Sequence, residues 1–170
     1  MSIKEEFTNL LAFFLREKPL ILGIGNPLKS DDSFGLAACD ELNNMGINCV
    51  KCEYGIESCL TEIKEKGARN ILIIDAIISQ DDPPGTLLLV NDDSLVNEKY
   101  LFTTHTLPLR TVLDILKKEF NVEKVIIIGV TPFSLDYGIE LTGDMKKSLK
   151  TFIEIFRDAY MRVGTEGREA

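Results

Sequence analysis

The sequence predicts a three-layer α/β/α domain built around a mostly parallel β-sheet. Strand signals alternate with helix signals along the chain, which is the order found in parallel α/β sheets. Two isoleucine-rich runs, 71–74 and 125–128, are continuously apolar, as strands buried on both faces are. The 170 residues contain no repeat, low-complexity tract or Pro/Gly/Ser-rich linker, so we expect a single main domain.

Hydrophobic periodicity places the elements in order. Ser2-x-x-Glu5 has the form of a capping box, and apolar residues at helical spacing follow it, so we expect 1–17 to form an N-terminal helical extension. The main domain should span 18–163, followed by a flexible tail at 164–170. Strands are predicted at 20–24, 47–52, 71–74, 86–90 and 125–128, and helices at 34–45, 58–66, 109–120 and 145–160.

One short connection predicts the sheet topology. About ten residues, 76–85, separate the third predicted strand from the fourth, whereas a parallel crossover needs roughly a dozen or more. The fourth strand should therefore run antiparallel, which gives a five-stranded, mostly parallel sheet with one antiparallel strand. Residues 92–104 would then return to the carboxyl edge of the parallel strands, the edge at which open α/β sheets bind ligands.

Composition excludes several classes of protein. The net charge of −8 leaves no basic excess to bind phosphates, so we expect no nucleic-acid partner. No apolar run approaches the roughly 20 residues of a membrane span, so we expect no membrane insertion. The N-terminus is acidic early and helical in period, unlike a signal peptide. These features predict a cytoplasmic protein.

The cysteines are expected to be structural. All four lie between Cys39 and Cys59, and Cys49 with Cys52 forms a C-x-x-C, a spacing found in redox pairs and zinc half-sites. However, a redox pair belongs at a helix start, whereas Cys49 falls in a predicted strand. No second C-x-x-C or nearby histidine completes a zinc set. We therefore expect buried, inert thiols in a reducing compartment.

The loop after the first strand contains glycines and two adjacent acids. The dinucleotide fingerprint G-x-G-x-x-G fails at Leu28, and acids at this point would repel phosphate, so a nucleotide-binding module is disfavoured. An Asp ahead of a helix commonly caps it and contributes about 1 kcal/mol. One of Asp31 and Asp32 is expected to do so, and for Asp32 capping and ligand binding remain equally open.

Two more side chains are expected at the same edge. Asp75 ends the third predicted strand, where a carboxylate needs a partner, a proton or a metal; hydrogen bonding to a loop is the alternative. His105 is the single histidine and precedes a predicted helix, a position that also suits a structural histidine. Together with Asp32 they provide two carboxylates and one imidazole, an open site suited to nickel or zinc.

Other catalytic signals are weak. Glu57 follows the second strand at the same edge, either as a helix N-terminal charge or as a functional group. A Cys–His pair would have to join His105 to a cysteine no nearer in sequence than Cys59. The sequence contains neither H-E-x-x-H nor G-x-S-x-G, so no separate nucleophile or base stands out. Residues 131–138 follow the last strand and could form a wall of the same cleft.

Three motifs, kept in order, resemble the hydrogenase maturation proteases, the endopeptidases that finish the large subunit of nickel–iron (NiFe) hydrogenases. The motifs are Gly25-Asn26-x-x-x-x-Asp31-Asp32, Ile73-Ile74-Asp75-Ala76 and Thr103-Thr104-His105-x-x-Pro108-Leu109. The histidine motif, with Ile128-Gly129-Val130-x-Pro132 after it, is most similar to the branch that serves hydrogenases of the formate-hydrogenlyase, or hydrogenase 3, type. The resemblance covers about 20–160 of the sequence.

The resemblance implies a phosphorylase/hydrolase-like fold and a nickel-dependent endopeptidase that removes a C-terminal peptide from the large-subunit precursor after nickel insertion. It assigns the catalytic metal contacts to Asp32, Asp75 and His105. The nickel is carried mainly by the precursor, and zinc or cadmium can substitute for it in crystals. The remaining substrate-binding residues are expected to be Gly25, Asn26, Glu57 and Thr104. A nickel-sensing chaperone without proteolytic activity is the alternative, because recognition and cleavage would use the same residues.

The sequence departs from the family pattern at two points. The residue after the acid pair is usually glycine, and here it is Ser33. Serine suits a helix start, so we expect a small backbone change and an intact site. The helix at the N-terminus is the second departure, an addition that could pack on the sheet, aid dimer formation or touch the precursor.

Overall fold

A computed structural model describes residues 1–91, 100–102 and 109–169 of the chain. The strands are β1 Leu20–Gly25, β2 Val50–Glu53, β3 Asn70–Ser79, β4 Leu87–Asn91, β5 Tyr100–Phe102 and β6 Lys124–Val130. The α-helices are α1 Ile3–Leu15, α2 Phe34–Asn44, α3 Leu60–Lys66, α4 Leu109–Glu119 and α5 Gly143–Glu169. Two short 3-10 helices precede α2 and α3, η1 Ser30–Ser33 and η2 Ile56–Cys59.

The sheet has the predicted mixed topology. Its main path runs β2-β1-β3-β6-β4. The first four strands in this path are parallel, and β4 pairs antiparallel with β6. The antiparallel direction inferred from the short connection is therefore confirmed. The structure adds β5, a strand that the sequence did not predict, which pairs antiparallel with the end of β3.

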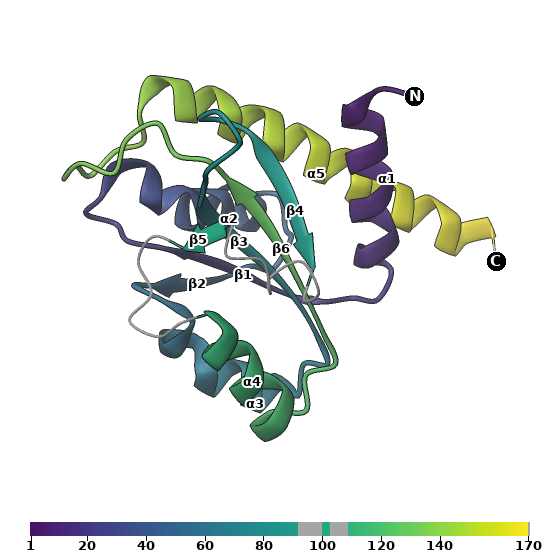
Figure 1. Cartoon of the computed structure of the whole chain (residues 1–170). Helices are drawn as coiled ribbons and strands as arrows, with labels where there is room; N and C mark the ends of the chain where they lie inside the picture. The colour runs from purple at the N-terminus through teal and green to yellow at the C-terminus, as the bar shows by residue number, and fades with distance from the viewer. Residues whose placement is uncertain (92–99, 103–108, 170) are drawn as a thin grey trace.

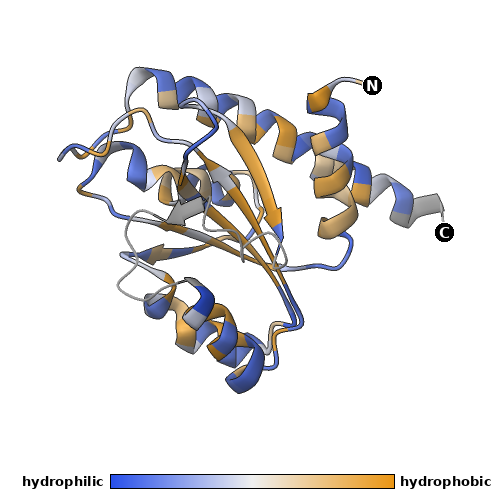
Figure 2. Cartoon of the chain, in the orientation of Figure 1, coloured by the Kyte–Doolittle hydropathy of each residue, from blue (hydrophilic) through white to orange (hydrophobic). Residues whose placement is uncertain are grey.

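Helices cover both faces of the sheet and form two apolar cores (Figure 1). One core joins α1, α2 and α5 to one face, and its largest side chains include Phe34, Phe152 and Phe156. The other core lies between the opposite face and α3 and α4, and contains Ile63 and Leu116. Figure 2 shows the strands as mostly hydrophobic and the helices as two-sided, the pattern expected of amphipathic helices on a buried sheet.

The third strand is longer than its isoleucine run. The prediction ended it at Ile74, but β3 continues to Ser79. Pairing with β6 stops at Ala76, and beyond this point β5 supplies the partner for Ile77 and its neighbours. Asp75 therefore lies within β3, next to the end of the parallel pairing, rather than after the last strand residue.

Both ends of the chain are helical in the described residues. Ser2 caps α1, because its hydroxyl oxygen accepts a hydrogen bond from the Glu5 N–H at 3.1 Å, as the capping-box pattern predicted. At the other end α5 continues through Gly164 to Glu169. The prediction that the helix stops before 164 is wrong, since a glycine costs a helix only about 1 kcal/mol and does not end it.

The cysteines are buried as predicted, but they are not free thiols. Cys39 pairs with Cys49 and Cys52 with Cys59. Residues three apart along a strand point to opposite faces, and Cys49 and Cys52 accordingly lie in different cores. Each therefore bonds to a cysteine on its own face of the sheet. The inference of a reducing compartment loses this support, because disulfides persist mainly under oxidising conditions.

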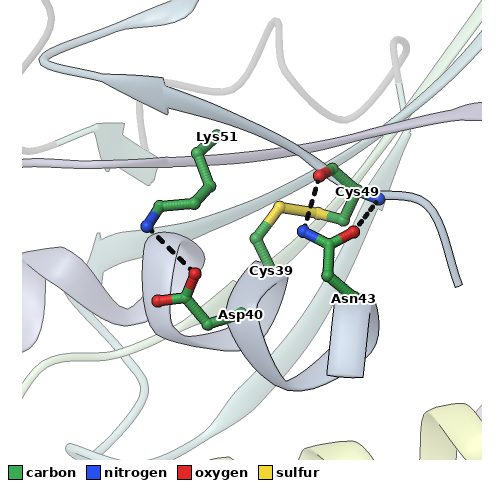
Figure 3. A network of polar contacts seen from close by, with 5 residues as sticks. All are labelled: Cys39, Asp40, Asn43, Cys49 and Lys51. Carbon is green, nitrogen blue, oxygen red and sulfur yellow. Dashed lines mark hydrogen bonds and ion pairs between the residues drawn. A yellow bond between two sulfur atoms is a disulfide. The ribbon is translucent and has the colours of Figure 1, made fainter. Parts of the chain in front are cut away.

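The Cys39–Cys49 disulfide is part of a wider clamp between α2 and the start of β2 (Figure 3). The Asn43 side chain accepts a hydrogen bond from the Cys49 N–H at 2.9 Å and donates one to the Cys49 carbonyl at 3.0 Å. Lys51 and Asp40 form an ion pair of 2.9 Å beside it. This edge strand is thus fixed to α2 by covalent and polar bonds.

None of the helices in the described ranges is long and apolar enough to cross a membrane.

Candidate functional site

The predicted acidic site residues that the structure describes come from the carboxyl edge of the sheet. Asp32 lies in η1, directly after β1, Glu57 lies in η2 after β2, and Asp75 lies near the end of the parallel part of β3. Thr104 and His105 lie outside the described residues. Within the described ranges, no group of three His, Cys, Asp or Glu side chains is arranged to hold a metal ion.

Asp32 is held in place by the glycine and asparagine that the sequence singled out. The residue is fully buried, and its carbonyl oxygen accepts a hydrogen bond from the Asn26 N–H at 3.3 Å. A side-chain carbon at Gly25 would lie 2.3 Å from the same carbonyl oxygen, far inside van der Waals contact. Gly25 is therefore required for the close approach of the two backbone segments.

A second glycine brings the start of α2, which follows Asp32, close to β3, which contains Asp75. Gly35, in the first turn of α2, packs so closely that a side-chain carbon there would meet the carbonyl oxygens of Ile24 at 2.2 Å and Ile74 at 2.3 Å. The first turn of α2 therefore lies directly on β1 and β3. η1 precedes this turn and itself contacts β3, so both aspartates are fixed at one end of the same helix–strand contact.

Asp75 is an internal carboxylate, with 1% of its surface exposed. Its Oδ1 accepts a hydrogen bond from the Ala76 N–H at 2.8 Å, and its neighbour across the sheet is Gly129 of β6. A buried carboxylate with apolar strand residues before it needs polar partners or a cation to be stable. The bond to Ala76 provides one such partner within β3 itself.

Asp31 has a different role from its neighbour, as a clasp between two loops. It is fully buried, and its Oδ2 accepts hydrogen bonds from the N–H groups of Phe133 and Ser134, each at 3.0 Å. The hydroxyl of Thr142 donates to Oδ2 at 3.0 Å and its N–H donates to Oδ1 at 2.8 Å. Thr142 also accepts from the Met145 N–H and so caps α5.

Ser33, where the family usually has glycine, fits without strain. Its φ is −84°, a value that any residue adopts. Its hydroxyl donates to the Ser30 carbonyl at 2.7 Å and makes no capping bond to α2. The serine thus closes the 3-10 turn instead of capping the helix. That the site stays intact with serine at this position remains a prediction.

A groove of about 390 Å³, called the edge groove below, opens beside these residues. One wall comes from the end of β3 and the turn after it, and the other from the loop after β6, which Asp31 holds. The lining residues are Ile78, Ser79, Asp82, Pro84 and 131–135. The groove is thus lined by β3 from three residues beyond Asp75, and its far wall includes 131–135 of the predicted cleft segment.

Glu57 carries an unusual carboxylate. Its Oε1 is buried and has no hydrogen-bond partner among the described residues. The other carboxylate oxygen, Oε2, packs against Gly55, whose φ is 147°. A side-chain carbon at residue 55 would lie 2.1 Å from this oxygen, so the glycine leaves the space that Glu57 occupies. Glu57 thus folds back over its own loop at the edge of the sheet, a position that leaves an acceptor for an N–H donor or a cation.

The chain matches the hydrogenase maturation protease family over residues 55–159. It is 32% identical to the hydrogenase 2 maturation protease of Escherichia coli over 162 residues, which cover 89% of this chain and 96% of that protein. The chain belongs to the hydrogenase maturation protease family. The family resemblance read from the three motifs is therefore confirmed.

Two further relatives of this maturation protease define the fold and the range of the family. The hydrogenase 3 maturation protease of E. coli is 28% identical over 136 residues, covering 78% of this chain and 84% of that protein. A nickel–iron hydrogenase maturation protease from Thermococcus kodakarensis has a solved structure with 27% identity, a TM-score of 0.66, and coverage of 80% and 94%. The chain is thus similar in sequence to proteases of both the hydrogenase 2 and the hydrogenase 3 type, and the T. kodakarensis protease shares its α/β fold.

Proposed function

We propose that this maturation protease removes the C-terminal extension of a nickel–iron hydrogenase large-subunit precursor after nickel insertion. In this proposal Asp32, Asp75 and His105 contact the nickel carried by the precursor. The observation that carries the proposal is the placement of two buried carboxylates at the carboxyl edge, held together by Gly25 and Gly35, in a chain of this family. A cytoplasmic location remains a prediction.

Chain connectivity supports the inclusion of His105. Phe102 pairs with Ile77, two residues beyond Asp75 in β3. His105 follows Phe102 by three residues, which span at most about 11 Å when fully extended. This short connection to β5 is the reason for including His105, which lies outside the described residues, among the proposed metal contacts.

The edge groove suits the polypeptide that must lie beside the metal. A protease has to hold several residues on either side of the bond it cuts, and an extended peptide commonly binds in a mostly apolar groove with a few polar groups. We assign this groove to the precursor chain next to its nickel. We further propose that Gly25, Asn26, Glu57 and Thr104 complete the substrate contacts.

A three-residue contact fits a metal that arrives with the substrate. Two carboxylates and an imidazole leave coordination positions open, which the precursor's own ligands can fill. A nickel ion held next to the cut bond can act as a Lewis acid that polarises the carbonyl group. Recognition of the metal and activation of the bond would then depend on the same three side chains.

The deciding experiment incubates the purified protein with nickel-loaded and with nickel-free precursor and measures the mass of the large subunit. We expect trimming of the nickel-loaded form alone. The variant His105→Ala should abolish trimming while the melting temperature changes by less than about 3 °C, because a side chain used only to contact the precursor's nickel contributes little to stability. Thermal unfolding followed by circular dichroism gives the second measurement.

Three other results would contradict the proposal. Binding of the loaded precursor with no change in its mass would make the protein a nickel-sensing chaperone. Equal trimming of both precursor forms would remove nickel from the recognition step. A His105→Ala variant that unfolds would show a structural histidine and not a metal contact.

A further inference from the structure

Asp31 joins two segments that are distant in sequence but adjacent at the edge of the sheet. Its carboxylate collects four hydrogen bonds from residues 102 to 111 positions further along the chain. Hydrogen bonds to an ionised acceptor are roughly twice as strong as neutral ones. The carboxylate is therefore the main polar connection between η1 and the loop after β6.

Backbone bonds extend this connection on both sides of Asp31. Its N–H donates to the Ser134 carbonyl at 3.3 Å, and the Ser30 N–H donates to the Gly138 carbonyl at 2.9 Å. The Gly138 N–H in turn donates to the Leu28 carbonyl at 3.0 Å. The residues leading into Asp32 are thus attached to the 131–138 loop by backbone bonds as well as by the Asp31 side chain.

The two attached segments are the two parts of the candidate site. One side of the clasp is Asp31, the residue before Asp32. The Asp32 carbonyl oxygen accepts a hydrogen bond from the Asn26 N–H. The other side is the pair of N–H groups of Phe133 and Ser134, which line the edge groove. A shift in the Asp31 carboxylate would therefore change the distance between the metal contact and the groove wall.

We propose that Asp31 is a positioning residue of the protease: it sets the metal contact Asp32 and the groove wall at 133–134 in one fixed arrangement. This inference rests on the proposed function. It predicts a loss of metal binding and of processing when the clasp is weakened, even in a variant that stays folded. A merely structural Asp31 predicts a loss of stability alone.

The test compares Asp31→Asn with Asn43→Ala as a matched control. The first variant replaces an acceptor oxygen by an NH2 group that faces the N–H donors. The second removes two hydrogen bonds to Cys49 far from the site, and so weakens the fold without touching the clasp. Three measurements are made on the full chain: thermal unfolding, cadmium affinity by calorimetry, and the kcat and KM for nickel-loaded precursor.

We expect both variants to melt earlier and only Asp31→Asn to lose function. Its cadmium affinity should fall by about tenfold or more, the usual effect of removing a group that orients a metal contact, and its kcat/KM should fall with it. Should Asp31→Asn fail to fold, Thr142→Val serves instead, because it removes one hydroxyl donor to the clasp. Thr142→Ser keeps that hydroxyl and should restore the wild-type values.

The possible failures are distinguishable. If the clasp variants bind cadmium and process precursor as the wild type does, Asp31 is structural and the inference is wrong, while the proposed function stands. If the wild type itself binds no cadmium and trims no precursor, the proposed function is wrong, and the positioning role with it.

Discussion

Gly25 determines the position of the charged residue Asp32 because it has no side chain. The Asp32 carbonyl occupies the space that a side chain at this residue would need. The two backbone segments in contact are the end of β1 and the turn that follows it. Their close approach therefore depends on backbone geometry alone.

Gly25→Ala should therefore displace Asp32. The new carbon would lie 2.3 Å from the Asp32 carbonyl oxygen, so the turn has to move outward. We expect a loss of about 1–3 kcal/mol in the free energy of unfolding, as for other overpacked sites, and a loss of precursor processing. Urea unfolding and the processing assay measure the two effects.

Gly164→Ala is the matched control for that change. This glycine lies in α5 with nothing within 4 Å of the position a side chain would take. The alanine should raise the free energy of unfolding by about 0.5–1 kcal/mol and leave processing unchanged. Equal behaviour of the two variants would contradict the role assigned to Gly25.

The two neighbouring aspartates mark the limit of what could be predicted from local sequence. The sequence predicted that one acid of the pair caps the following helix, and this is wrong: α2 has no side-chain cap, and the buried Asp31 carboxylate bonds the loop after β6 instead. Its partners, however, are more than 100 residues away, and no local pattern specifies them. The sequence could name a pair of acids, but only the folded loops show which oxygen atoms receive the hydrogen bonds.

At the scale of single elements, β2 is a short edge strand with one partner in the sheet. It has four residues, lies at the edge, and pairs only with β1. A strand of this length has little pairing energy of its own. Two disulfides, at Cys49 just before the strand and at Cys52 within it, attach β2 to the rest of the fold in addition to its pairing with β1.

Loss of either disulfide should lower the free energy of unfolding by about 2–3 kcal/mol, from loop-closure entropy in the unfolded chain. The variants Cys39→Ala with Cys49→Ala, and Cys52→Ala with Cys59→Ala, test each bond in turn by urea unfolding. Alkylation of the unfolded, unreduced wild type should label none of the four cysteines. Labelling of all four would show free thiols instead.

Prediction from sequence worked best for elements whose own residues show the apolar pattern of a buried strand or an amphipathic helix. The isoleucine runs of β3 and β6 and the amphipathic helices were found because burial leaves a periodic pattern. β5 was missed, because a three-residue strand exists only where the extended end of β3 offers it a partner. The disulfide pairs were missed as well, since their formation depends on which face of the sheet each cysteine meets.

At the scale of the whole molecule, α1 belongs to the main fold and is more than an appendage. Its Leu11, Phe14 and Leu15 are buried in the core that also contains α2 and α5, and α1 lies across α5 in Figure 1. Of the roles left open for the added helix, packing against the domain is the one the structure shows.

Two adjacent leucines of α1 provide a test of this packing. Leu11 is 0% exposed and Leu10 is 51% exposed. Leu11→Ala should lower the free energy of unfolding by about 2–5 kcal/mol, as cavities in a core do, whereas Leu10→Ala should change it by less than about 0.5 kcal/mol. Neither variant should change the kcat for precursor. Similar stabilities for both would mean that α1 is not docked in solution.

The disulfides of β2 also restrict how two copies of the chain can associate. An exposed edge strand is a common route to exchange between neighbouring molecules and to aggregation. Here the strand is bonded to α2 through Cys49 and to η2 through Cys52, so an oxidised chain cannot release it to a second copy. Strand-swapped dimers through β2 therefore require a reductant, and the oxidised protein is protected against this form of misassembly.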